Sequence, residues 1–186
     1  MKNIVVIEGP SGAGKDTLIR ELVNKYPHLY IKMPSITSRA MREGESQGSP
    51  YFFVTREQFK QKIDSNEVFE FTVMNRDSEY RGMSKAIIDD LLKTDKVQLK
   101  DCDWVGIEAL RREYPNRVLA IHINVPKEEV AKRIAERGGD VEDMAKRLAD
   151  YDEYNTKIKK YCDITVNNTS MDECVIKLHE IISGSN

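Results

Sequence analysis

The sequence of 186 residues contains only three cysteines, Cys102, Cys162 and Cys174, and no Cys-x-x-Cys pair. An odd number of scattered cysteines argues against a disulfide framework and predicts reduced thiols in a cytoplasmic protein. No apolar run approaches the roughly 18 residues that a membrane span needs, and the first residues lack the layout of a signal peptide. These absences exclude the membrane, secreted, fibrous and zinc-ribbon classes.

Neither sign of charge is in excess, because 29 Lys and Arg stand against 31 Asp and Glu, for a net charge of −2. This balance argues against a general binder of nucleic acid or of an acidic membrane surface. With 40% hydrophobic and 32% charged residues, the composition is ordinary for a folded protein of about one domain. The sequence leaves open whether the protein forms a homo-oligomer.

Short apolar runs alternate with segments of helical periodicity along the chain. Strands are expected at 4–7, 68–74, 96–99, 117–123 and 164–166. Helices are expected at 17–26, 55–65, 84–92, from Pro126 onward, at 141–161 and from Ser170 onward, with capping boxes at Thr55 and Ser170. The alternation predicts an α/β fold, a parallel sheet covered by helices on both faces. The polar stretch 34–50 is too long for a simple connection and is expected to be a functional loop.

A phosphate-binding motif follows the first expected strand and opens the first helix. It reads Gly9-Pro10-Ser11-Gly12-Ala13-Gly14-Lys15-Asp16-Thr17. Its glycines let successive backbone N–H groups turn toward phosphate oxygens, and the positive helix end adds to them. Lys15 is expected to reach the β- and γ-phosphates. The alternative is a glycine-rich turn that merely ends in lysine, but the strand before it and the helix after it favour a P-loop.

Asp16 stands where this motif carries Ser or Thr, whose hydroxyl binds Mg²⁺. A carboxylate oxygen is also a ligand of Mg²⁺, so Asp16 is a candidate metal ligand. Without a metal, its charge would repel the phosphates, which predicts a tighter dependence on the metal. Alternatively, Asp16 only favours the first turn of the helix, and Thr17 supplies the hydroxyl one position later.

Beyond the P-loop, the chain resembles the guanylate kinase family from residue 3 to about residue 182. Ordered matches before residue 55 are Ser35, Ser38-Arg39, Arg42, Gly44-Glu45, Gly48 and Tyr51-Phe52-Phe53-Val54. Later matches are Phe69-Glu70-Phe71 (one residue out of step), Tyr80-Arg81-Gly82-Met83, Asp101-Cys102-Asp103-Trp104-Val105-Gly106, Arg133 to Gly138, Arg147-Leu148 and Val166-Asn167-Asn168-Thr169. So many matches in order are more specific than a P-loop alone.

The resemblance implies a P-loop NTPase-type parallel sheet flanked by helices, with an inserted region that binds a nucleoside monophosphate (NMP) and a lid. Residues 1–34, 84–136 and 143–186 would form the P-loop core, 35–83 the NMP-binding region and 137–142 the lid. The implied activity is transfer of the γ-phosphoryl group of ATP to GMP, with Mg²⁺ as cofactor. Such an enzyme is cytoplasmic, belongs to purine nucleotide metabolism and has small-molecule substrates.

The resemblance also assigns roles that the side-chain chemistry supports. Lys15, Arg133, Arg137 and Arg147 would stabilise charge on the transferred phosphoryl group, and Asn167 would join the P-loop in the ATP site. The acceptor would be held by Ser35, Arg39, Arg42, Tyr51, Glu70, Arg81, Asp101 and Asp103. The guanidinium groups suit a monophosphate, and Glu70 can accept hydrogen bonds from guanine N1–H and its amino group. Ser35 would bind the guanine carbonyl, whereas Asp101 and Asp103 would hold metal-bound water or a substrate hydroxyl.

Three departures from the family pattern bear on the acceptor. Arg81 replaces a Tyr that contacts phosphate, and Met83 replaces a Ser or Thr that hydrogen-bonds guanine. Asp16 is shared with ribose 1,5-bisphosphate phosphokinases, which resemble this family but generally lack an acid at the Glu70 position. The residues favour GMP; a ribose 1,5-bisphosphate phosphokinase, a kinase of another NMP or dNMP, and a non-catalytic scaffold are the alternatives.

Overall fold

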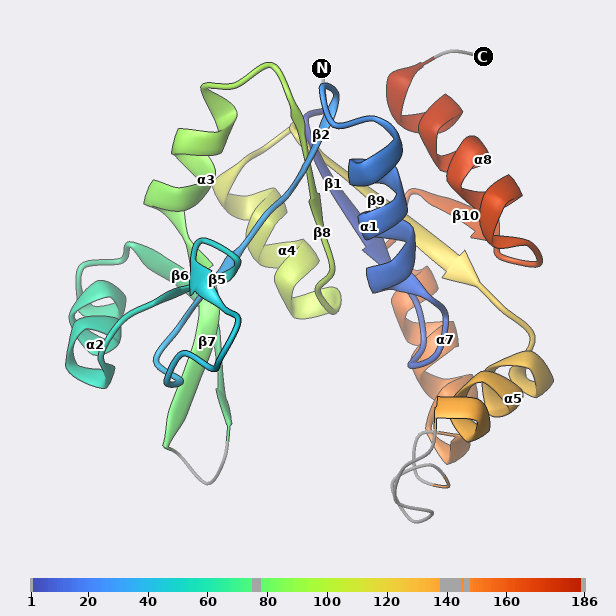
Figure 1. Ribbon diagram of the computed structural model, residues 1–186, viewed down its shortest axis with the longest axis horizontal. Helices are drawn as coiled ribbons and strands as arrows, with labels where there is room; N and C mark the ends of the chain where they lie inside the picture. Colours follow the sequence, from blue (N-terminus) through green and yellow to red (C-terminus); the bar gives the residue numbers. More distant parts are fainter. Residues whose placement is uncertain (1, 75–77, 138–144, 146–147, 185–186) are drawn as a thin grey trace.

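The computed structural model describes residues 2–74, 78–137, 145 and 148–184 (Figure 1). Two sheets organise this part of the chain. The first sheet is parallel and has the strand order β10-β9-β1-β8-β2. Its strands are β1 (Ile4–Glu8), β2 (Tyr30–Lys32), β8 (Val97–Lys100), β9 (Val118–Asn124) and β10 (Ile164–Asn167).

Helices cover both faces of this sheet, because its central strand is apolar on both sides. Val5 and Ile7 of β1 pack in one core with α1 (Lys15–Lys25), α5 (Lys127–Arg137) and α8 (Met171–Ser183). Ile4 and Val6 pack in a second core with α3 (Lys85–Leu92), α4 (Trp104–Glu113) and α7 (Tyr151–Lys159). The predicted parallel sheet with two covered faces is therefore confirmed. No helix in the described ranges is long and apolar enough to cross a membrane.

The second sheet is mixed and has the order β4-β5-β3-β7-β6. Its strands are β3 (Ser35–Thr37), β4 (Ser46–Gln47), β5 (Pro50–Phe53), β6 (Val68–Met74) and β7 (Glu79–Ser84). The helix α2 (Arg56–Asp64) packs beside it and shares a small core made by Ile36, Phe59 and Val68. Figure 1 shows this sheet with α2 set apart from the helices that cover the first sheet.

Two predictions about local structure are wrong. The stretch 34–50 is not a loop throughout, since β3, β4 and the first residue of β5 lie in it. These strands have two to four residues, too few to show a period of two in the sequence. Ser170 begins α8 without the predicted capping box, because its side chain makes no cap hydrogen bond. The capping box at Thr55 is confirmed, with Gln58 N–H donating to Thr55 Oγ1 and Thr55 N–H donating to Gln58 Oε1.

Candidate active site

The P-loop connects the end of β1 at Glu8 with the start of α1 at Lys15. Gly12 and Gly14 both have φ of +87°, a left-handed conformation that favours glycine. Gly9 is required for a different reason, because a Cβ there would lie 2.5 Å from the carbonyl oxygen of Ile123. The predicted arrangement of strand, glycine-rich turn and helix is therefore present.

Lys15 lies folded against its own loop. Its Nζ donates to the carbonyl oxygen of Gly9 at 2.6 Å and lies 3.6 Å from Oε1 of Glu8. Glu8 is buried, with 3% of its surface exposed, and accepts a hydrogen bond of 2.7 Å from the Tyr154 hydroxyl. Burial raises the pKa of Glu8 from 4.5 to about 7, although Lys15 and Tyr154 act in the opposite direction. Lys15 thus has a buried carboxyl group as its neighbour.

Asp16 points away from the core and forms an ion pair with Lys32 of β2, at 2.9 Å between Oδ1 and Nζ. Its side chain is 74% exposed, so the carboxylate is accessible to a ligand. No group of three or more His, Cys, Asp or Glu able to hold a metal occurs among the described residues. A divalent cation here would therefore have Asp16 as a protein ligand beside oxygens of substrate phosphate and water.

Arg133 of α5 approaches the P-loop from the opposite side. Its Nε donates to Glu129 at 3.0 Å and its Nη2 to the carbonyl oxygen of Asn168 at 3.4 Å, while Nη1 is buried without a partner in the described part of the chain. Nη1 lies 3.8 Å from where a Cβ on Gly14 would stand. Arg133 therefore lies beside the P-loop.

The structure gives different results for the other residues that we predicted to lie with Lys15 and Arg133 in the ATP site. Asn167 pairs with Asn124, whose Nδ2 donates to it at 2.9 Å. The buried neighbour Asn168, which we did not predict as a site residue, donates to the Ala13 carbonyl oxygen of the P-loop at 2.9 Å. Arg137 ends α5, but its side chain, Arg147 and most of the expected lid 137–142 lie outside the described residues.

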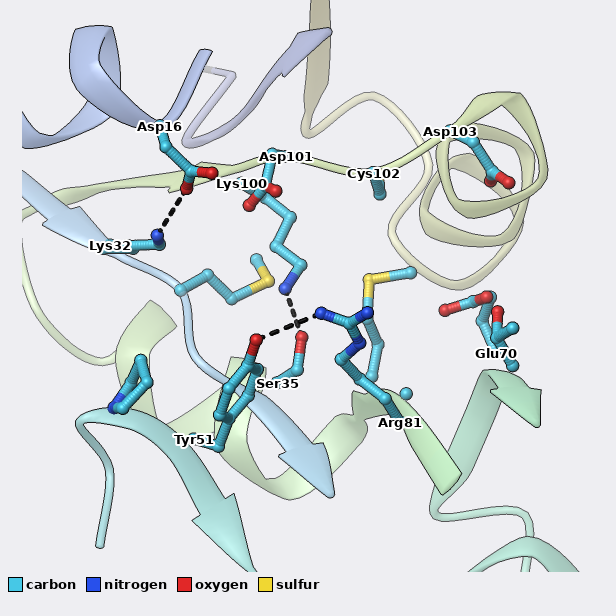
Figure 2. A pocket seen from close by; sticks show the side chains of 15 residues that line it. Asp16, Lys32, Ser35, Tyr51, Glu70, Arg81, Lys100, Asp101, Cys102 and Asp103 are labelled. Atoms are coloured by element: carbon cyan, nitrogen blue, oxygen red, sulfur yellow. Dashed lines mark hydrogen bonds and ion pairs between the residues drawn. The ribbon is translucent and has the colours of Figure 1, made fainter. Parts of the chain in front are cut away.

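A cavity of about 310 Å³ lies where the two sheets meet (Figure 2). The first sheet and α1 contribute polar side chains from Asp16, Lys32 and Lys100, and the connection between β8 and α4 contributes Asp101 and Asp103. The second sheet contributes Ser35, Tyr51, Glu70, Thr72, Arg81 and Met83. Six of the eight predicted acceptor residues therefore line one cavity, which also reaches the P-loop at Asp16.

Strand pairing explains how residues far apart in the sequence meet there. Ser35 of β3 is opposite Tyr51 of β5, and Glu70 of β6 is opposite Met83 of β7. Arg81 donates to the Tyr51 hydroxyl at 3.0 Å across the sheet. Gly82 permits this packing, because a Cβ there would lie 2.3 Å from the Glu70 carbonyl oxygen. The close approach of β6 and β7 thus sets the position of Glu70.

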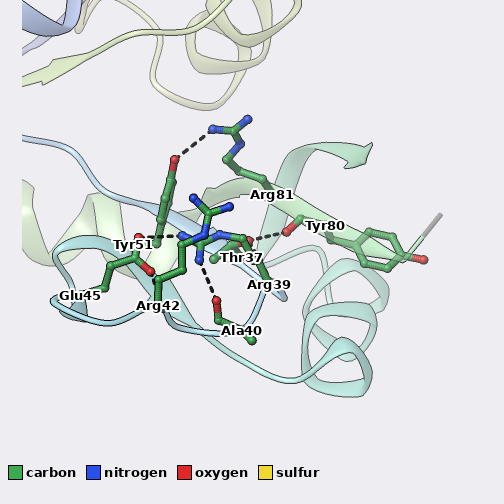
Figure 3. A network of polar contacts seen from close by, with 8 residues as sticks. All are labelled: Thr37, Arg39, Ala40, Arg42, Glu45, Tyr51, Tyr80 and Arg81. Atoms are coloured by element: carbon green, nitrogen blue, oxygen red, sulfur yellow. Dashed lines mark hydrogen bonds and ion pairs between the residues drawn. The ribbon is translucent and has the colours of Figure 1, made fainter. Parts of the chain in front are cut away.

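Arg39 and Arg42 are held by a small network rather than by the cavity wall (Figure 3). Arg39 donates to Glu45 at 2.8 Å and stacks over the rings of Tyr51 and Phe53. The backbone N–H of Arg42 donates to the other oxygen of Glu45, also at 2.8 Å. These contacts hold the pKa of the Glu45 carboxyl below its ordinary value. Since Tyr51 also lines the cavity, the network holds both arginines close to its rim.

Asp103 has a structural role that the sequence analysis did not identify. Its Oδ1 accepts a hydrogen bond from the Gly106 N–H at 3.0 Å and so caps α4. Asp101, two residues earlier, lies between β8 and α4 and lines the cavity. Asp103 can therefore use only part of its hydrogen-bonding capacity for a ligand.

The polar residues at this site that the sequence analysis missed include Glu8, Lys32, Lys100 and Tyr154, besides Asn168 and Thr72. Glu8 and Lys100 each end a largely buried strand directly before a motif, and this position was the available signal. Lys32 follows the buried Tyr30 at the end of a strand of three residues. Tyr154 stands inside a charged helical segment, and no local pattern distinguishes it.

The guanylate kinase family model matches residues 1–185 of the chain. The guanylate kinase of Photorhabdus laumondii is 34% identical over 189 aligned residues, which cover 96% of this chain and 86% of that protein. The guanylate kinase of Porphyromonas gingivalis is 33% identical, with 98% and 97% covered. A crystal structure of the guanylate kinase from Anaplasma phagocytophilum matches the fold with a TM-score of 0.68 at 24% identity, covering 98% of this chain and 85% of that chain.

Proposed function

Because this chain belongs to the guanylate kinase family and transfers the γ-phosphoryl group of ATP to GMP, we propose that the cavity between the two sheets binds GMP and the P-loop binds ATP. One observation supports this assignment: Asp16 belongs both to the P-loop motif and to the lining of the cavity, so substrates bound at the two sites would lie side by side. Phosphoryl transfer needs this proximity above all, since the reaction depends on positioning and on charge stabilisation.

On the ATP side, we assign the β- and γ-phosphates to Lys15 and to the backbone N–H groups of 9–17. Lys15 would leave the carbonyl oxygens of its own loop when phosphate oxygens replace them. Arg133 would stabilise the charge that spreads over the transferred group. This role is supported by its Nη1, which lies beside Gly14 and has no hydrogen-bond partner among the described residues. We propose the same role for Arg137 and Arg147, and an ATP contact for Asn167.

On the acceptor side, we assign the monophosphate to Arg39, Arg42, Tyr51 and Arg81. The first three meet in the Glu45 network, and Arg81 bonds to Tyr51. The base is assigned to Ser35 and Glu70, whose carboxylate is half-buried in the cavity wall. Asp101 and Asp103 would contact substrate hydroxyl or water at the strand end. Residues 35–83 are thus proposed as the acceptor region, the flanking segments 1–34, 84–136 and 143–186 as the core, and 137–142 as the lid.

Mg²⁺ is proposed as the metal that accompanies ATP. The residues present fit it, because an exposed carboxylate at the first turn of α1 is a hard oxygen ligand next to the phosphate site. The ion would neutralise phosphate charge. Asp16 would hold it after giving up its pairing with Lys32, which becomes free to face the acceptor cavity.

A substrate panel tests the proposal. ADP release is measured with ATP, with and without Mg²⁺, across GMP, dGMP, AMP, UMP, CMP and ribose 1,5-bisphosphate. We expect turnover with GMP, weaker turnover with dGMP, and none without the metal. Turnover with the sugar phosphate alone would assign the cavity to a different acceptor, and turnover with AMP equal to that with GMP would remove Glu70 from base recognition.

A further inference from the structure

Lys100 is the last residue of β8, and its side chain enters the acceptor cavity from the first sheet (Figure 2). Only 6% of its surface is exposed. Its Nζ donates to Ser35 Oγ at 2.5 Å, which is its one hydrogen-bond partner among the described residues. An ammonium group carries three N–H donors, so two of them have no protein acceptor in this part of the chain. Burial lowers the pKa of Lys100, whereas Asp101 acts in the opposite direction. Buried N–H donors without acceptors beside a ligand cavity are costly unless a ligand accepts from them.

The bond between Lys100 and Ser35 fixes which way the serine hydroxyl points. An ammonium group has no lone pair, so Ser35 Oγ must accept from it. The hydroxyl hydrogen of Ser35 is then free to donate elsewhere. Lys100 and Ser35 therefore form a pair of donors, and both line the cavity.

On the second sheet, Glu70 offers hydrogen-bond acceptors instead of donors. Glu70 offers carboxylate oxygens to the same cavity. Burial raises the pKa of Glu70 and Asp103 adds to the shift, whereas Lys100 and Arg81 lower it. Met83 of β7 pairs with Glu70 of β6 and is buried, with 2% of its surface exposed. Its side chain offers only a thioether sulfur. Met83 is the position at which the family resemblance leads one to expect a hydroxyl donor.

We propose that Lys100 is a specificity-determining residue that donates to the 6-carbonyl oxygen of guanine and supplies the donor that Met83 lacks. Guanine presents this carbonyl beside its N1–H and 2-amino donors, which matches a donor pair at Lys100 and Ser35 and an acceptor at Glu70. Adenine presents an amino group at the same position, and its hydrogens would face the ammonium group. The inference depends on the proposed function, since it assumes that the base of GMP occupies this cavity.

The test compares wild type with Lys100→Met on three acceptors. GMP has the 6-carbonyl, the N1–H and the 2-amino group, and inosine monophosphate lacks only the 2-amino group. The third acceptor, 2-aminopurine riboside 5′-monophosphate, lacks the carbonyl and with it the N1–H, so each comparison is made between wild type and variant on the same acceptor. We expect kcat/KM of the variant to fall about 10- to 100-fold for GMP and for inosine monophosphate, the loss of one charged hydrogen bond. The 2-aminopurine substrate should change by less than about threefold, and the KM for ATP should stay the same.

Two controls separate this role from others. Lys32→Met removes a lysine from the same cavity and should leave the ratio of GMP to 2-aminopurine turnover unchanged. Ser35→Ala removes the second donor and should also lower that ratio. This second variant keeps the proposal testable if thermal unfolding experiments show that Lys100→Met does not fold. An equal loss on all three acceptors would overturn the proposal, as would no loss at all. A wild-type protein that fails to phosphorylate GMP would instead refute the proposed function.

Discussion

The two sheets are built on different principles although they meet at one cavity. In the first sheet all five residues of β1 are buried, and apolar side chains pack on both of its faces. In the second sheet β5 alternates exposed and half-buried residues, and three consecutive residues of β6 are exposed. Its strands are also fixed by side-chain hydrogen bonds, since Thr37 Oγ1 donates to the Tyr80 carbonyl oxygen and the Tyr80 N–H donates to Ser38 Oγ.

This difference separates what each sheet contributes to the reaction. Apolar burial holds the first sheet and places the P-loop with few polar groups. The second sheet leaves polar side chains facing the cavity, and we propose that these, together with Lys100 at the end of β8, select the acceptor. A variant in the P-loop should therefore affect every acceptor, whereas a variant among these cavity residues should affect acceptors selectively.

The largest expected effect is from Lys15→Ala, on the side of the first sheet. Removing the phosphate-binding charge should lower kcat by roughly 10²- to 10³-fold or more for every acceptor, because this charge acts on the transferred group. Steady-state kinetics measure the loss, and circular dichroism checks the fold. Lys25→Ala, on the last turn of the same helix, is the control. Robust turnover by the Lys15 variant would remove Lys15 from the mechanism.

Glu70→Gln should have a smaller and selective effect. Converting the carboxylate into an amide puts a donor opposite guanine donors, so kcat/KM for GMP should fall about 10- to 100-fold. The KM for ATP should be unaffected, because Glu70 lies on the second sheet. Glu57→Gln, on the exposed surface of α2, should change neither constant. Equal damage to GMP and ATP kinetics would indicate that Glu70 is structural.

Glu8→Gln tests how much a buried carboxyl group in the first sheet lowers the stability of the protein. Its expected effect is on the free energy of unfolding. The folded state holds the Glu8 proton up to a pKa of about 7, whereas the unfolded state releases it near 4.5. The free energy of unfolding of the wild type therefore falls as pH rises between these values. Lys15 offsets part of this loss, so Glu8→Gln should be more stable than wild type at pH 8 by about 1–3 kcal/mol.

Chemical denaturation at pH 5 and pH 8 provides the measurement for Glu8→Gln. Its advantage should shrink toward pH 5, where Glu8 is protonated in the folded wild type. Glu21→Gln changes a half-buried carboxylate on α1 and should show no such pH-dependent difference. An advantage that is the same at both pH values would show that the Glu8 carboxyl is not neutral when folded.

The contrast between the sheets also explains what the sequence could predict. The run Ile4–Ile7 is apolar throughout, and the motif 9–17 follows it after the single residue Glu8, so β1 and the P-loop were predictable. β4 consists of Ser46–Gln47 alone, and no periodicity can appear in two residues. Partners far along the chain were equally hidden, because Lys100 meets Ser35 across 65 positions. The acceptor residues were found through a family resemblance, whereas the pairing that gathers them needed coordinates.

The protein contains a single tryptophan, Trp104. Its ring lies 5.5 Å from the ring of Tyr154, and Lys157 Nζ is 3.8 Å above it. Tyr154 in turn donates to Glu8, which faces the phosphate-binding lysine. The one indole chromophore is thus linked to Lys15 of the P-loop through three successive contacts. Its intrinsic fluorescence can be followed in a stopped-flow instrument without a dye or a label, and a change on adding ATP would show that it senses the P-loop.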